Sequence, residues 1–253
     1  MISVKRNGHV VVATLARLPV NALNGEIVAR LEAVVDEVTA DKEIAMLRVR
    51  SDQKVFCAGA DLALMHRCFS TLEGPDAMLA FVRRMQLFFQ RIEMAPFLTL
   101  AEIGGAAVGG GMELALSCDL RIAANEANLG LPEAQLGLLP GAGGTQRLAR
   151  LCGIGVAKRL ILGGQVVDGS EAARLEMVQW ACPREELADK AHALAIHYAA
   201  IPRVTLAANK RCLAAISDPA RDGFAEELTG TRDLYDYPET RRRVSEFLNR
   251  KKV

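Results

Sequence analysis

Two glutamates, each beside glycine or proline, are the residues of this sequence with the clearest potential for chemistry. Glu113 closes the segment 104–113, which reads GGAAVGGGME, and Glu133 directly follows Pro132. Two buried carboxylates that face one substrate can act as an acid/base pair, because repulsion between them decides where the shared proton sits. Either glutamate can equally be an ordinary first-turn helix residue that interacts favourably with the helix dipole. The spacing of Glu113 and Glu133 leaves both interpretations open.

Glycine-rich segments beside these glutamates are candidates for binding negative charge. Residues 109–111 are three glycines at the start of a predicted helix, where backbone N–H groups are open to an anion or a developing oxyanion. Residues 140–147 (PGAGGTQR) form a weaker candidate of the same kind. The segment 56–62 (FCAGADL) could expose the N–H of Ala60, while Asp61 is expected to cap the next helix. Close packing of backbone against backbone is the competing explanation for the glycines.

Several other chemistries lack their usual sequence signals. The chain has no G-x-x-x-x-G-K-[ST] loop, no G-x-G-x-x-G after a predicted strand and no G-x-S-x-G. Its four histidines form no H-E-x-x-H, and its six cysteines form no C-x-x-C pair. We therefore expect no metal, no serine triad, no thiol redox chemistry and no bound dinucleotide.

Composition indicates a soluble globular protein whose main partner is not a nucleic acid. The 253 residues include 31 Lys and Arg against 30 Asp and Glu, so the formal net charge is only +1, and 51% are hydrophobic. Binding of a polyanion normally needs a strong basic excess, and the 12 aromatic residues are not interleaved with basic ones. No apolar run reaches the roughly 18 residues of a membrane span, and no secretory signal precedes the first strand. We expect a cytoplasmic protein that does not bind membranes.

Hydrophobic periodicity predicts alternating strands and helices up to about residue 183. Strands are expected at 2–4 and 10–14 around a type I′ turn at Asn7-Gly8, and a helix is expected after an Asn24 cap. A long apolar helical stripe runs from Met78 to Ile92. Further strands are predicted at 44–49, 97–100 and 119–123.

Beyond residue 183 the pattern is entirely helical. Four helices separated by prolines are predicted at 184–200, 203–216, 220–235 and 239–250. The sequence thus predicts a mixed α/β part, 1–183, and a helical part, 184–253. The last segment, 239–253, holds six basic and two acidic residues. Such a run usually forms a solvated helix face, and a phosphate-binding or subunit-contact role is the alternative.

Taken together and in order, five segments resemble the enoyl-CoA hydratase/isomerase (crotonase) superfamily. These segments are 19–24, 56–62, 105–123, 131–133 and 139–148. The resemblance implies an α/β fold, a crotonase-like spiral of ββα units with an acyl-CoA site in 1–183. It also implies that 184–253 is a helical trimerisation region, so the expected assembly is a homotrimer or a dimer of trimers.

The resemblance also implies a substrate and roles for individual residues. Members bind an acyl-CoA thioester, so coenzyme A is part of the substrate and no separate cofactor is expected. The backbone N–H groups of Ala60 and Gly110 would form the oxyanion hole. Contacts to CoA or substrate would fall at residues spread over three of the segments: Ala22, Ala58, Asp61, Leu62 and Gly141.

Both glutamates match positions that hydratases of this family use, which favours hydration of a 2-enoyl-CoA to a 3-hydroxyacyl-CoA. Glu113 would deprotonate the water and Glu133 would protonate C2. An enoyl-CoA isomerase or a specialised acyl-CoA dehydratase is the alternative within enzymes. A non-enzymatic member that binds RNA or a protein partner is the alternative outside them.

Three departures from the family pattern concern CoA affinity and acyl preference. Ala63 stands where many hydratases have a lysine that reaches the CoA phosphates, the segment 175–178 lacks the usual glycine, and Thr240 replaces a glycine after Glu239. The basic segment at the C-terminus, contributed by a neighbouring subunit, could replace the missing lysine.

Overall fold

A six-stranded sheet organises the first part of the chain in this computed structural model, which describes residues 1–250. Its strands follow the order β1 (Ile2–Asn7), β2 (Val10–Leu15), β3 (Met46–Ser51), β4 (Leu98–Ile103), β6 (Leu120–Ala124) and β9 (Trp180–Cys182). Only the β1–β2 pair is antiparallel, and each later neighbour is parallel. Every residue of β4 is buried, as expected for a central parallel strand covered on both faces.

The first hairpin is present, but its turn differs from the prediction. Asn7 pairs with Val10 as the last rung of the ladder, so Gly8 and His9 are the two connecting residues. Gly8 has a φ of 60°, whereas His9 is not among the residues with positive φ. A positive φ at the first connecting residue alone is the pattern of a type II′ turn, so the expected type I′ turn at Asn7-Gly8 was wrong.

A second, three-stranded sheet carries the segments around the glycine-rich helix start. It consists of β5 (Ala107–Val108), β7 (Asn128–Gly130) and β8 (Val166–Asp168), with β7 in the middle. An isolated bridge between Cys57 and Ala107 connects it to the loop after β3, and another joins Leu23 to Ala60. These short pairings bring segments far apart in the sequence to one edge of the molecule.

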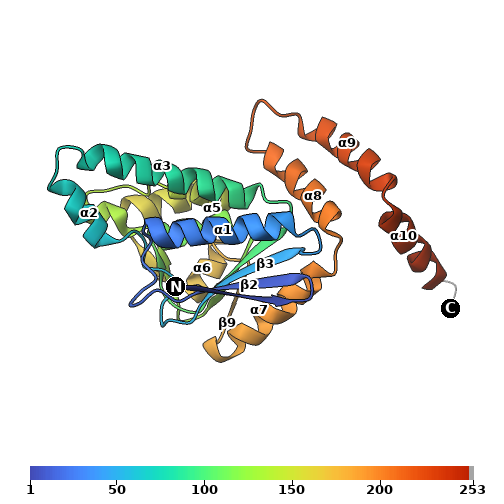
Figure 1. Ribbon diagram of the computed structural model, residues 1–253, viewed down its shortest axis with the longest axis horizontal. Helices are drawn as coiled ribbons and strands as arrows, with labels where there is room; N and C mark the ends of the chain where they lie inside the picture. Colours follow the sequence, from blue (N-terminus) through green and yellow to red (C-terminus); the bar gives the residue numbers. More distant parts are fainter. Residues whose placement is uncertain (251–253) are drawn as a thin grey trace.

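Helices cover both faces of the large sheet. The helices of this part are α1 (Gly25–Ala40), α2 (Leu62–Phe69), α3 (Gly74–Glu93), α4 (Gly110–Ser117), η1 (Pro132–Leu136), α5 (Gly144–Leu162) and α6 (Gly169–Arg174). Figure 1 shows α1 and α3 on one side of the sheet and α7 (Arg184–Ala199) on the other. Asn24 caps α1 as predicted, because its side chain accepts hydrogen bonds from the N–H groups of Glu26 and Ile27.

The four helices predicted beyond residue 183 are present in the described residues, with bounds close to the predicted ones. After α7 come α8 (Arg203–Ala215), α9 (Gly223–Tyr235) and α10 (Pro238–Arg250). α7 packs across β2, β3, β4 and β6, whereas α9 and α10 extend away from the body as an arm (Figure 1). The arm exposes large apolar side chains, namely Phe224, Leu228, Tyr235, Val244, Phe247 and Leu248.

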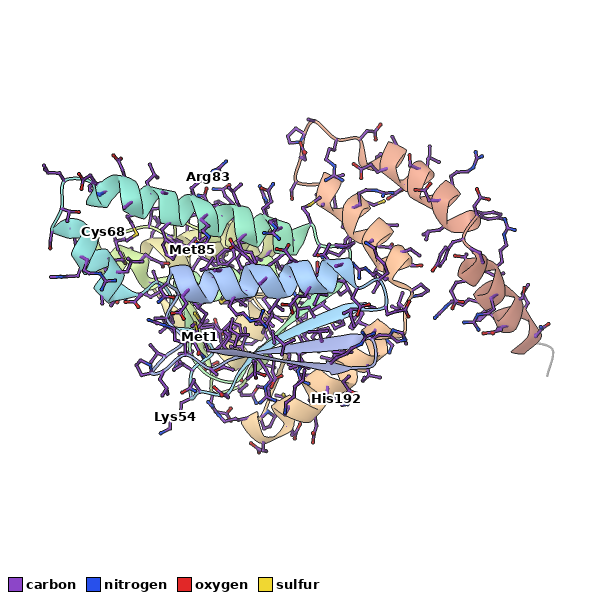
Figure 2. The ribbon with its side chains drawn as sticks, in the orientation of Figure 1. Met1, Lys54, Cys68, Arg83, Met85 and His192 are labelled. Carbon is purple, nitrogen blue, oxygen red and sulfur yellow. The ribbon has the colours of Figure 1, made fainter. Side chains whose placement is uncertain are left out.

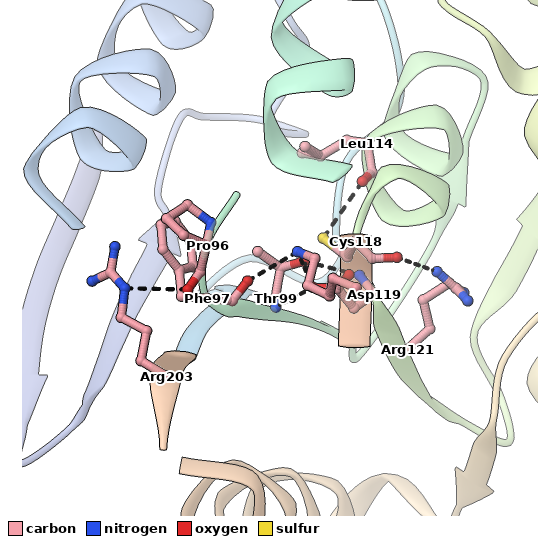
Figure 3. Close-up of polar contacts among 9 residues, drawn as sticks. Pro96, Phe97, Thr99, Leu114, Cys118, Asp119, Arg121 and Arg203 are labelled. Carbon is pink, nitrogen blue, oxygen red and sulfur yellow. Dashed lines mark hydrogen bonds and ion pairs between the residues drawn. The ribbon is translucent and has the colours of Figure 1, made fainter. Parts of the chain in front are cut away.

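Partly buried polar contacts hold α8 against the body (Figure 3). Arg203, the first residue of α8, donates to the carbonyl oxygens of Pro96, Val38, Thr39 and Ile44 over 3.0–3.2 Å. Lys210 in the same helix donates to Asp119 Oδ2 over 2.8 Å. Charged donors on backbone oxygens at the end of α1 and the start of β4 thus anchor the base of the arm.

Candidate active site

One cavity of about 250 Å³ collects most of the residues singled out from the sequence. Its walls come from the loop after β3, from α2 and α3, from the start of α4, and from η1 and the loop that follows it. Figure 2 shows Met85 on the inner side of α3, toward this cavity, and Arg83 on the outer side. Apart from Glu113 and Glu133, the lining side chains are apolar.

Glu113 projects from the first turn of α4 and is almost completely buried, with 2% of its surface exposed. α4 begins after Gly109, whose φ of 54° suits glycine. The N–H of Gly144 donates a hydrogen bond of 2.8 Å to Glu113 Oε1. Burial raises the pKa of Glu113 to about 7, and the charge of Glu133 adds to the rise, while the Gly144 hydrogen bond opposes it. A carboxyl group with that pKa can accept and release a proton near neutral pH.

The contact between Glu113 and Gly144 requires glycine at position 144. A Cβ atom on Gly144 would lie 3.0 Å from both Cγ and Oε1 of Glu113 and 2.9 Å from Cβ of Pro140. Gly143, the residue before α5, has a φ of 106°, a left-handed conformation that favours glycine. The second glycine-rich segment is therefore in direct contact with the first glutamate.

Glu133 lies in the short 3₁₀ helix η1, on the other side of the Gly109 backbone. A Cβ atom on Gly109 would lie 3.2 Å from Glu133 Oε1. Burial raises the pKa of Glu133. Its Oε2 atom is buried and has no hydrogen-bond partner within residues 1–250. A buried acceptor without a partner at a cavity wall is a position where a substrate or a proton can bind.

The backbone N–H groups of Ala60 and Gly110 lie at the same end of the cavity. A Cβ atom on Gly110 would lie 3.5 Å from the nitrogen of Ala60. Gly110 is the first residue of α4, so its N–H has no partner inside the helix. The Leu23–Ala60 bridge uses the N–H groups of Leu23 and Asp61, and no hydrogen bond from the Ala60 N–H is found among the described residues.

The remaining predicted residues divide into those that line the cavity and those beside it. Ala58, Leu62 and Gly141 line it. Ala22 and Asp61 do not line it but meet through Arg17, whose guanidinium donates to Ala22 O over 2.9 Å and to Asp61 Oδ2 over 2.8 Å.

Both carboxylate oxygens of Asp61 accept hydrogen bonds that stabilise the local structure. Its Oδ1 accepts from the N–H groups of Ala63 and Leu64 and so caps α2, as predicted. The Arg17 hydrogen bond is the largest of the effects that lower the pKa of Asp61. Sequence reasoning missed Arg17, and nothing in its neighbours distinguishes it from a surface arginine.

Three arginines of the basic C-terminal segment that was expected to replace the missing lysine, Arg241, Arg242 and Arg243, are paired on their own arm. Arg242 and Arg243 form ion pairs with Glu239, and Arg241 contacts Asp236. The arm lies at the opposite end of the molecule from α2, the helix that begins beside the cavity (Figure 1). Within one chain, these arginines are therefore remote from Ala63.

Within residues 1–250, no group of three or more His, Cys, Asp or Glu side chains is arranged to hold a metal ion. No helix in the same range combines the length and apolarity needed to cross a bilayer.

Comparison with known proteins identifies the family of this chain. The model of the enoyl-CoA hydratase/isomerase family matches residues 5–253. A probable enoyl-CoA hydratase of Bacillus subtilis is 39% identical over 207 residues, which cover 81% of this chain and 79% of that protein. The mitochondrial methylglutaconyl-CoA hydratase of Mus musculus is 38% identical over 180 residues, or 71% of this chain and 56% of that protein. The chain thus spans little more than half the length of the mouse relative.

Solved structures agree with the sequence matches. The crystal structure of an enoyl-CoA hydratase from Bacillus anthracis superimposes with a TM-score of 0.91 at 30% identity, covering 98% of this chain and 96% of that one. The architecture is that of the crotonase fold, as the sequence predicted. The chain belongs to the enoyl-CoA hydratase/isomerase family, an enzyme family whose members act on acyl-CoA thioesters.

Proposed function

We propose that this protein catalyses the reversible hydration of a 2-enoyl-CoA thioester to a 3-hydroxyacyl-CoA. The observation that carries the proposal is the placement of two carboxylates with raised pKa values, Glu113 and Glu133, on one cavity with the N–H groups of Ala60 and Gly110. The hydratase names of the relatives support the same reaction.

Each group has one task in this reaction. Ionised Glu113 removes a proton from water as the hydroxyl oxygen bonds to C3, and negative charge moves to the thioester oxygen. The N–H groups of Ala60 and Gly110 donate hydrogen bonds to that oxygen, an effect typically worth ~10²–10³ in rate per donor. Protonated Glu133 then gives its proton to C2. Before the next turnover Glu113 releases its proton to solvent and ionised Glu133 takes one up from solvent, which restores both groups.

Hydration is favoured over double-bond isomerisation because both carboxylates contact the cavity. Moving a double bond from C3–C4 to C2–C3 requires one base that removes a proton from C2 and returns it to C4. Addition of water requires one group to deprotonate the water and another to supply the proton at C2. A site with Glu113 held by Gly144 and Glu133 carrying an unpaired oxygen supplies both groups.

The lining of the cavity supports an uncharged, apolar acyl group. Methionine and aromatic or aliphatic side chains of α2 and α3 form part of the cavity wall: Met65, Met78, Phe81, Val82 and Met85. No lysine, arginine or histidine of the described chain lines the cavity. A carboxylate at the end of the acyl chain would be buried without a partner, which costs several kcal/mol.

We further propose that the CoA moiety extends from Leu62, which lines the cavity, to Ala22 and Asp61 outside it, and that coenzyme A is required only as part of the substrate. The exposed apolar residues of α9 and α10 support self-association, and we propose a homotrimer or a dimer of trimers located in the cytoplasm. Light scattering of the purified protein tests the assembly, and a monomeric mass would contradict it.

Product analysis tests the reaction itself. The protein is incubated separately with a 2-enoyl-CoA and a 3-enoyl-CoA of equal chain length, and the products are separated by chromatography. We expect 3-hydroxyacyl-CoA from the 2-enoyl substrate and little conversion of the 3-enoyl substrate. Rapid formation of 2-enoyl-CoA from the 3-enoyl substrate, without water addition, would assign an isomerase instead.

A further inference from the structure

The hydrogen bond from Gly144 to Glu113 depends on a tight turn that has no side-chain cap of its own. Gly143 is the residue before α5 and lies in the left-handed region, and no side chain caps the helix start. Glycine loses much conformational freedom on folding, so a turn of Ala142, Gly143 and Gly144 needs an external contact to hold one conformation.

Arg147 supplies that contact from the first turn of α5. Its Nη1 donates a 2.8 Å hydrogen bond to the carbonyl oxygen of Ala142. A Cβ atom on Gly143 would lie only 2.2 Å from the same Nη1, so the guanidinium packs directly against the backbone of the turn. Arg147 therefore contacts both residues that precede Gly144, whose N–H donates the hydrogen bond to Glu113.

The guanidinium is itself fixed from the opposite side by α3. Its Nη2 forms a 2.7 Å ion pair with Glu93, and its carbon Cζ lies 6.0 Å from the centre of the Phe89 ring. Only 10% of the Arg147 side chain is exposed. An arginine that is buried, paired and packed on an aromatic ring loses little freedom when it holds a neighbouring loop.

We propose that Arg147, held by Glu93, is a positioning residue that fixes the 142–144 turn so that the N–H of Gly144 meets the Glu113 carboxylate. Arg147 donates no hydrogen bond to Glu113 and acts through the turn and through its charge. The catalytic effect of Arg147 rests on the proposed function. Its contacts with the turn do not depend on which reaction the site catalyses.

The charged groups that influence Glu113 come from two elements. Glu133 of η1 and Arg147 of α5 act on it in opposite directions, the glutamate raising and the arginine lowering its pKa. The side chains of α3 that line the same cavity are Met78, Phe81, Val82 and Met85, which carry no charge. Loss of Arg147 therefore removes both a favourable charge and the fixed N–H donor, and both changes raise the pKa of Glu113.

The test compares Arg147→Gln with Glu93→Gln and with a matched control, Arg150→Gln. Arg150 lies three residues further along α5 and is exposed, with no hydrogen bond or ion pair found for it among the described residues. Side-chain carboxyl NMR follows the titration of Glu113 in each protein, with the resonance assigned from its absence in Glu113→Gln. Turnover of crotonyl-CoA is measured over the same pH range.

In Arg147→Gln we expect the pKa of Glu113 to rise above its wild-type value, and kcat at neutral pH to fall about tenfold to a hundredfold. Glu93→Gln should move both quantities the same way but less, and Arg150→Gln should move neither. An unchanged Glu113 titration in a folded Arg147→Gln protein would overturn the assignment. Absence of hydration by the wild-type protein would refute the proposed function alone, since the titration of Glu113 would still respond to Arg147.

Discussion

Glu113 and Glu133 line one cavity but are held in opposite ways. The N–H of Gly144 fixes one oxygen of Glu113, whereas Oε2 of Glu133 is buried and has no hydrogen-bond partner within the described part of the chain. A fixed carboxylate suits a base that must meet a water molecule in one orientation. A carboxyl group with a free oxygen suits proton transfer to an atom that arrives with the substrate.

The pKa of Glu113 predicts how activity depends on pH. Glu113 must be ionised to take a proton from water, and its pKa is about 7. We therefore expect kcat/KM for crotonyl-CoA to rise with pH through about 7 as Glu113 ionises, and to fall again at higher pH once Glu133 loses the proton that it must donate, since this parameter reports ionisations of the free enzyme. A profile that stays flat between about pH 5.5 and about pH 8.5 would show that Glu113 is not the essential base.

The same shift makes Glu113 a destabilising residue above neutral pH. Its pKa is about 7 in the folded protein against the ordinary 4.5 of a glutamate, so the folded state binds the proton more tightly. Stability from this group is fully present below pH 4.5 and is lost as pH rises through about 7, by roughly 3 kcal/mol in all.

Glu113→Gln should therefore be more stable than the wild type at about pH 8, with the difference shrinking toward about pH 5. Urea unfolding at several pH values measures this difference. The exposed Glu126→Gln serves as the control and should change the free energy of unfolding by less than about 0.5 kcal/mol. A Glu113→Gln protein less stable than the wild type at alkaline pH would contradict the burial argument.

Alanine substitutions at two glycines of α5 test whether glycine is needed for catalysis at one of these positions and not at the other. An alanine at Gly144 would press on Glu113 and Pro140, whereas a Cβ atom on Gly155 meets nothing within 4 Å. We expect Gly144→Ala to lower kcat about a hundredfold by displacing the Glu113 carboxylate. Gly155→Ala should keep full activity and gain up to about 1 kcal/mol of stability. Equal activities of the two variants in the crotonyl-CoA assay would show that the Glu113–Gly144 contact has no catalytic role.

The sequence predicted the principal elements, because they leave local signals, whereas the two glutamates that line the cavity were given catalytic roles only through the family resemblance. Asn24 and Asp61 cap helices through contacts two or three residues away, and the stripe ending at Ile92 forms the buried face of α3. Such short-range hydrogen bonds and periodic burial can be identified without knowledge of the rest of the chain.

The small sheet and the contacts around the cavity could not be predicted in this way. β5 and β7 pair over only two residues each, too few for a hydrophobic pattern. Arg17 contacts Asp61 from 44 positions away, and Arg147 contacts Glu93 from 54 positions away. Both arginines resemble ordinary surface residues in the sequence, and only the folded backbone shows that they hold elements of the site.

The most direct test of the proposed function is hydration of crotonyl-CoA by the wild type, Glu113→Gln and Glu133→Gln. The assay follows loss of the absorbance of the conjugated thioester, and circular dichroism verifies that all three proteins are folded. We predict rapid hydration by the wild type and a loss of at least about a hundredfold in kcat for each variant. Near-normal turnover in either folded variant would contradict the assignment of Glu113 and Glu133 as the acid/base pair.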